Sequence, residues 1–173
     1  PGDDPVPAIA AQPLTVLNNF SIQNNAYFDV TQPAPDLNVT VSGNFIINST
    51  ATYLPGTNTT TFNGSGPQSF DASGTINGNL YNLTLTNSSD LTLYGNNLTV
   101  LNTFTLGSGC TLRDNGRTVT VQGNIGNSGT HFKPVSGAGS IILTGTNAQI
   151  ISGDGNGIFN NLTLNKTGGS VTI

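Results

Sequence analysis

The sequence predicts an all-β chain folded as a right-handed parallel β-helix (β-solenoid) of about eight coils. Charged residues make up only 7% of its 173 residues, whereas ordinary soluble domains carry about 25%. Short apolar–polar–apolar triplets recur between Gly and Asn turns, which predicts short strands rather than helices. The whole pattern occurs twice, about 80 residues apart, and such a period is typical of a solenoid. Parallel crossovers are almost always right-handed, which gives the expected hand.

The strand triplets place Thr or Ser between two apolar residues. Because side chains alternate across a strand, the apolar pair points into the shaft and the hydroxyl points out. This alternation predicts Leu85 and Leu164 inside, and Thr84 and Thr163 outside. We expect a shaft filled by side chains, with no lumen. Clear examples are residues 20–22, 39–41, 83–85, 91–93, 98–100, 119–121, 162–164 and 171–173.

Internal repetition defines the organisation of the chain. Four segments recur in the same order: 14–22 as 98–106, 39–44 as 119–124, 61–68 as 142–149, and 82–85 as 161–164. We therefore expect a Pro-rich linker over 1–13, a first unit over 14–97 and a second over 98–173, each of about four coils. A β-sandwich is the structural alternative, because alternating strands with Gly/Asn turns also suit it, although a sandwich needs no such repeat.

The ends of the sequence suggest a longer protein. The chain starts at Pro1 with no charged-then-apolar leader, so we expect a processed or excerpted piece. The strand pattern runs up to Ile173, so we expect the array to continue, with neighbouring repeat units as end-to-end partners.

Charge and hydropathy exclude several classes of partner. The formal net charge is −4 with four Lys and Arg residues, whereas nucleic-acid binding needs clustered basic residues. No apolar run approaches the ~18 residues of a membrane span. The single cysteine, Cys110, cannot form an internal disulfide and is expected to be a small core residue.

The second repeat carries a family resemblance in Gln149–Asn165, which reads QIISGDGNGIFNNLTLN. It is similar to the Q-x-I-x-G turn followed by F-x-N-L-x-L of large secreted repeat proteins of the Bacteroidetes. The first copy departs from that pattern, with Asp71–Gly74 in the turn and Leu80-Tyr81 in place of Ile158-Phe159. The resemblance covers residues 14–173. It implies an exported, cell-surface, adhesin-like protein of the type IX secretion class, which includes gliding adhesins.

Few residues are candidates for chemistry. β-Helix enzymes that cleave acidic polysaccharides cluster Asp with Lys or Arg, and the nearest approximation here is Arg113-Asp114 with Arg117. We interpret that stretch as a solvated turn, and His131 with Lys133 as part of an exposed loop. One His and one Cys cannot supply the four ligands of a structural zinc site. We therefore expect no catalytic and no cofactor-binding residues.

Three further patterns have both a functional and a plain interpretation. Gly153–Gly157 resembles one repeat of a calcium-binding Gly/Asp array, which makes Asp154 the weak calcium candidate, although a glycine turn is favoured. Asn-x-Ser/Thr sequons are frequent, but composition alone produces many of them. Outward threonines suggest an ice-binding face, but ordinary β-surface threonine is favoured.

These observations predict a non-enzymatic structural or adhesive repeat module, a rigid stalk or spacer of an exported cell-surface protein. Its partner would be an unidentified surface, glycan or protein ligand, with no nucleic acid. The alternatives are a carbohydrate-active β-helix enzyme, which needs converging acids in a groove, and a glycan- or ice-binding face, which needs a regular ladder of side chains.

Overall fold

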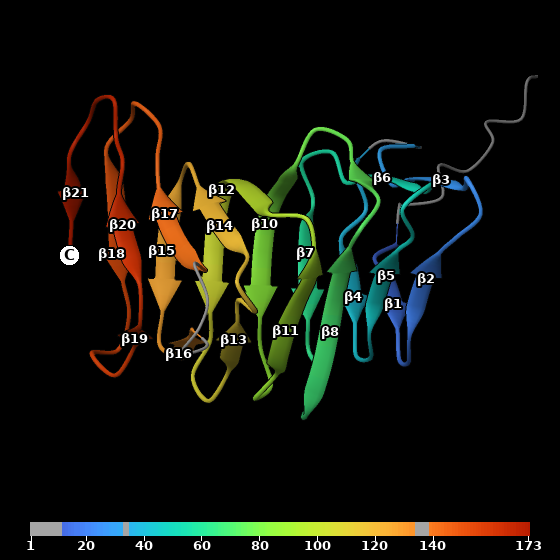
Figure 1. Ribbon diagram of the computed structural model, residues 1–173, viewed down its shortest axis with the longest axis horizontal. Helices are drawn as coiled ribbons and strands as arrows, with labels where there is room; N and C mark the ends of the chain where they lie inside the picture. Colours follow the sequence, from blue (N-terminus) through green and yellow to red (C-terminus); the bar gives the residue numbers. More distant parts are fainter. Residues whose placement is uncertain (1–11, 33–34, 134–138) are drawn as a thin grey trace, which may run out of the picture.

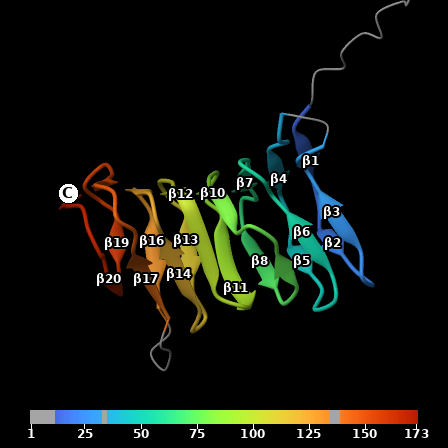
Figure 2. The same cartoon turned by 90° about the horizontal axis from the view of Figure 1, so that it is seen from above.

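The protein is a parallel β-helix, which confirms the expected fold class. The computed structural model describes residues 12–32, 35–133 and 139–173, so most of the expected linker over 1–13 lies outside the described residues. The described chain contains 21 strands, and every strand pairing is parallel (Figure 1). Successive turns follow one another along the long axis in both views (Figures 1 and 2). No helix in the described ranges is long and apolar enough to cross a membrane.

Hydrogen-bonded ladders define three faces of the rod. The first face contains β1 (Leu14–Val16), β4 (Val39–Val41), β7 (Thr59–Phe62), β10 (Leu80–Leu85), the second half of β12 (Leu98–Leu106), β15 (Asn124–Asn127), β18 (Gln149–Ser152) and β21 (Val171–Thr172). The second face contains β2 (Phe20–Ile22), β5 (Phe45–Ile47), β8 (Pro67–Ala72), β11 (Asp90–Gly95), β13 (Thr111–Arg113), β16 (Thr130–Phe132) and β19 (Ile158–Phe159). The third face begins with β3 (Tyr27–Asp29), β6 (Thr52–Leu54) and β9 (Thr75–Ile76), and continues with the first half of β12, β14 (Thr118–Val121), β17 (Ser140–Leu143) and β20 (Leu162–Leu164).

The second face contributes one strand to each turn, and it has seven strands. The described rod therefore has seven turns, with β21 beginning the next, where about eight coils were expected. At the usual ~4.8 Å between strands, seven turns extend about 34 Å.

The two repeats match strand for strand when the chain is divided at Leu98. The first contains β1–β11, and the second contains the two halves of β12 followed by β13–β21, so each has eleven strand segments. Eleven is not a multiple of three. The second repeat therefore starts on the third face, whereas the first starts on the first face.

The shaft is filled by inward side chains that stack from turn to turn. On the second face, Phe20, Phe45, Phe70 and Leu93 occupy successive register positions. The ring centroids are 5.0 Å apart between Phe20 and Phe45, and 5.2 Å apart between Phe45 and Phe70. Phe20 is partly buried and the other three are fully buried. Complete burial of such a side chain contributes ~1.5–3 kcal/mol, so this column stabilises adjacent turns against one another.

Leu164 takes the expected inward register position, opposite the buried Leu143, but it is not itself buried. Leu85 is fully buried, because β10 lies between β7 and β12. Its counterpart Leu164 is 56% exposed. The strand β20 pairs with β17 on one side, and within the described residues no strand covers its other side. Coverage by a following turn, and not alternation alone, decides whether this position is buried.

Asparagine side chains join successive turns in a repeated geometry. In six places the Asn Oδ1 accepts the backbone N–H of the residue at the equivalent position one turn later, over 2.8–3.2 Å. The pairs are Asn19 with Asn44, Asn38 with Thr59, Asn44 with Ser69, Asn82 with Thr103, Asn97 with Thr118, and Asn124 with Ile150. Each bond satisfies a main-chain donor next to a strand, which gives the high Asn content a structural role.

A buried glutamine braces the corner between the first two faces. Gln68 donates its Nε2 to the carbonyl oxygens of Val41 at 3.1 Å and Gly43 at 2.7 Å. Its Oε1 accepts the Ser89 hydroxyl at 2.6 Å and the Gly64 N–H at 3.0 Å. One amide therefore satisfies four polar groups that the turn brings into the interior.

The second repeat contains the same brace. Gln149 donates to the carbonyl oxygens of Val121 and Gly123, the counterparts of Val41 and Gly43. Its Oε1 accepts the Lys166 ammonium where Gln68 accepts a hydroxyl. The glutamine that opens the Q-x-I-x-G pattern is thus a buried structural group in both copies.

Candidate functional site

The surface is interrupted by a groove on the third face. The strand β9 pairs with β6, and the first half of β12 pairs with β14, but β9 and β12 do not pair with each other. Between Ala72 and Leu80 the chain has seven residues. In the next turn, between their register partners Gly95 and Val100, it has four. The longer connection cannot follow the shorter one, and a gap opens between them.

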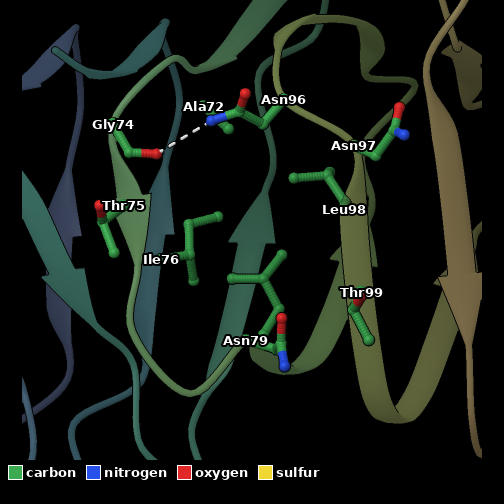
Figure 3. Close-up of a pocket in the computed structure, with 10 residues that line it drawn as sticks. Ala72, Gly74, Thr75, Ile76, Asn79, Asn96, Asn97, Leu98 and Thr99 are labelled. Atoms are coloured by element: carbon green, nitrogen blue, oxygen red, sulfur yellow. Dashed lines mark hydrogen bonds between the residues drawn. The ribbon is translucent and has the colours of Figure 1, made fainter. Parts of the chain in front are cut away.

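Ten uncharged residues line this groove, which has a volume of about 280 Å³: Ala72, Gly74, Thr75, Ile76, Asn79, Leu80, Asn96, Asn97, Leu98 and Thr99. Figure 3 shows Ile76 and Leu98 extending toward the gap from opposite sides. Asn96 spans the upper end and donates its Nδ2 to the Gly74 carbonyl oxygen at 3.3 Å. The lining offers amides, hydroxyls and the partly exposed side chain of Ile76, and it suits binding rather than acid–base chemistry.

The groove was not predicted from the sequence. Its local signal is the segment from Thr75 to Asn79, where an Asn-Gly turn interrupts the alternation, and Gly78 and Asn79 take positive φ values of 88° and 67°. The second signal is long-range, because the groove needs a shorter connection in the next turn. Without the pairing register, the segment looks like any other corner.

Asp114 and His131 correct two expectations. They were placed in a solvated turn and an exposed loop, but both side chains are fully buried, with His131 Nε2 3.0 Å from Asp114 Oδ2. His131 occupies an inward position of β16, in register with Leu112. The triplet Thr130-His131-Phe132 alternates like its neighbours, so this signal was present in the sequence. Asp114 Oδ1 also accepts the Gly116 N–H at 2.9 Å.

The environment of this pair keeps the imidazole neutral. Burial lowers the pKa of His131, and the hydrogen bond and charge of Asp114 offset part of that effect. A carboxylate only accepts hydrogen bonds, so Nε2 carries the proton, and Nδ1 has no hydrogen-bond partner among the described residues. The pair has the chemistry of a general base and its orienting acid. It is, however, closed to solvent, so in this conformation no substrate reaches it.

The structure separates Arg113, Asp114 and Arg117, the nearest approximation to a catalytic cluster in the sequence. Arg113 lies on the outer side of β13 and forms a two-point ion pair with Asp90, over 2.7 and 2.9 Å. Its guanidinium carbon is 5.0 Å from the centre of the Phe132 ring, a cation–π distance. Arg117 lies beyond the turn and donates its backbone N–H to the Asp114 carbonyl oxygen at 2.8 Å. The acid thus faces inward and Arg113 outward, and they do not form one site.

The remaining candidates lie in separate places. Cys110 is buried in the turn before β13, and Lys133 is half-buried just after β16. Asp154 is exposed, and its carboxylate accepts the Asn156 N–H at 2.9 Å, which lowers its pKa. Within the residues that the structure describes, no three His, Cys or Asp side chains gather as metal ligands would.

Outward threonines form a column along part of the first face. Five of them occupy successive register positions on the first face: Thr15, Thr40, Thr61, Thr84 and Thr105. The next position is Gly126, which ends the column. Tyr94 belongs to the second face. The ladder is regular over five turns and does not extend along the whole rod.

The chemistry of the groove and of the buried pair follows from their geometry. The groove is open and uncharged, and the buried His131–Asp114 pair belongs to the interior. No family model matches the chain, and no curated protein or solved structure matches it either.

Proposed function

We propose that this chain is a non-enzymatic structural module, a rigid spacer of an exported cell-surface protein of the adhesin-like class. The observation that supports the proposal most directly is the set of parallel ladders around a filled shaft. A spacer must hold two ends apart without bending, and stacked turns that contact only their neighbours do this with a length set by the number of turns.

The cross-turn bonds support a mechanical role. The main-chain hydrogen bonds of a parallel ladder run along the rod axis, so a pull along that axis acts on many of them together. The six Asn bonds and the Gln68 and Gln149 braces add side-chain links between turns. These interactions account for the Asn-rich composition without any need for catalysis.

The surface location is proposed from the sequence resemblance in Gln149–Asn165, together with the low charge of the chain. Type IX secretion is the route that this resemblance implies. The proposal predicts that antibodies against the 173-residue chain label intact cells of the producing organism, and that external protease removes the label. Labelling that appears only after lysis would contradict it.

Small-angle scattering tests the spacer geometry. A second copy of residues 14–173 fused in register adds two repeats of eleven strands, and each repeat should lengthen the rod by about 18 Å at the usual strand spacing. The cross-sectional radius should remain that of the single copy. A cross-section that grows while the length stays constant would contradict both the rod and the spacer function.

A further inference from the structure

We propose that the groove between β9 and β12 is a binding site for a neutral saccharide. This goes beyond the spacer function, which needs no ligand. It rests on the interruption of the third face and on the ten residues that line the gap.

The shape of the groove limits the size of its ligand. Its volume of about 280 Å³ is just below the ~300 Å³ at which small-molecule sites usually begin. It therefore suits one or two sugar rings and not a folded partner. Ile76 is partly exposed and offers an apolar contact for the C–H face of a ring, whereas Leu80 and Leu98 are buried beneath the groove.

The rim of the groove supplies hydrogen-bonding groups that are free to bind. Within the described residues, the hydroxyls of Thr75 and Thr99 and the amide of Asn79 make no hydrogen bond to another residue. Two other amides are held in place by the fold, since Asn96 donates to Gly74, and the Asn97 Oδ1 accepts the Thr118 N–H at 2.9 Å. The Asn96 Oδ1 is thereby fixed at the rim before a ligand binds, which lowers the entropy cost of binding, whereas the Asn97 amide points away from the gap toward the following turn (Figure 3).

The charge of the lining identifies the class of ligand. None of the ten residues is ionisable, so a phosphate, a uronic acid or a basic peptide would leave its charge without a partner. Amides and hydroxyls both donate and accept, as the hydroxyls of a neutral sugar do. No aromatic ring lines the groove for stacking, so we expect weak binding, with a Kd of about 1 mM or higher.

Nuclear magnetic resonance titration of the full 173-residue chain tests the site. The probes are the neutral disaccharides cellobiose, maltose, lactose and N,N′-diacetylchitobiose, with digalacturonate as the charged comparison, each up to ~20 mM at the weak end of measurable affinity. At least one neutral disaccharide should shift the amide signals of residues 74–80 and 96–99. No shift there with any neutral probe, or a stronger response to digalacturonate, would overturn the proposal.

A matched pair of variants separates the groove from the surrounding surface. The double variant Thr75→Val with Thr99→Val keeps the side-chain shape and removes two hydroxyls, and it should weaken binding about tenfold. The control is Thr120→Val, because Thr120 is the register partner of Thr99 on the same face and lies outside the groove. It should bind like the unchanged chain. Equal affinity in the double variant and the control would overturn the site, whereas the scattering test of the spacer would be unaffected.

Discussion

The imidazole of His131 is buried and neutral inside the shaft, and this couples folding to pH. Burial lowers its pKa in the folded chain, whereas in the unfolded chain it should titrate near ~6.5. As the pH falls through that value, the unfolded chain takes up a proton that the folded chain resists. The stability contribution is therefore complete above pH ~6.5 and is lost as the pH falls below it.

Urea unfolding between pH 7 and pH 5 measures this effect. His131 is the single histidine in the chain, and most carboxylates titrate below ~5, so the free energy of unfolding should fall in this window chiefly because of His131. In His131→Gln, whose amide can still donate to Asp114, the curve should be nearly flat. The same slope in both proteins would show that the imidazole is not buried in the neutral form.

Gln68 joins two turns at a corner and stabilises the connection between two strands. Replacing Gln68 with Leu would leave the Gly43 carbonyl oxygen and the Gly64 N–H without the partner that Gln68 provides, whereas the Val41 carbonyl oxygen would still accept the Asn63 N–H. Unsatisfied buried groups cost ~1–3 kcal/mol each, so we expect a loss of several kcal/mol in unfolding free energy. The control is Gln122→Leu, because Gln122 is exposed at the end of β14. Similar losses in the two variants would contradict the brace.

The two copies of one strand position should respond differently to a buried charge. Leu85→Asp places a carboxylate in the filled shaft and should cost several kcal/mol or prevent folding. Leu164→Asp should cost much less, because Leu164 is 56% exposed, and the outward Thr84→Asp should be nearly neutral. Denaturant midpoints measure all three. A loss in Leu164→Asp equal to that in Leu85→Asp would contradict the exposed position of β20.

Local patterns in the sequence were sufficient to predict the strands and the direction of most side chains. The alternation that placed Leu85 inside and Thr84 outside depends on neighbouring residues, and it holds. The groove could not be predicted, because it results from two connections of unequal length in different turns. Asp114 was expected in solvent because Asp-Asn-Gly is a typical turn sequence. Its partner, His131, comes from the next turn, and local sequence does not show that the two side chains meet.

At the scale of the whole molecule, stability comes from contacts between adjacent turns. The aromatic column from Phe20 to Phe70 and the Asn bonds all link a turn to the next one. Loss of one turn's packing should therefore weaken its immediate neighbours most, as in other solenoids.

The eleven-strand repeat also determines how far equivalent positions are rotated around the rod axis from one repeat to the next. Each repeat makes three turns and two thirds of a fourth, so an equivalent position in the next repeat lies one third of a revolution away. In a tandem array of this repeat, a feature formed at each junction between units, such as the groove, would recur along a helical path around the rod axis. Three junctions would point three ways before the first direction returned. Such a filament could bind a ligand from any side without twisting, because eleven strands per repeat place successive sites at different positions around the circumference.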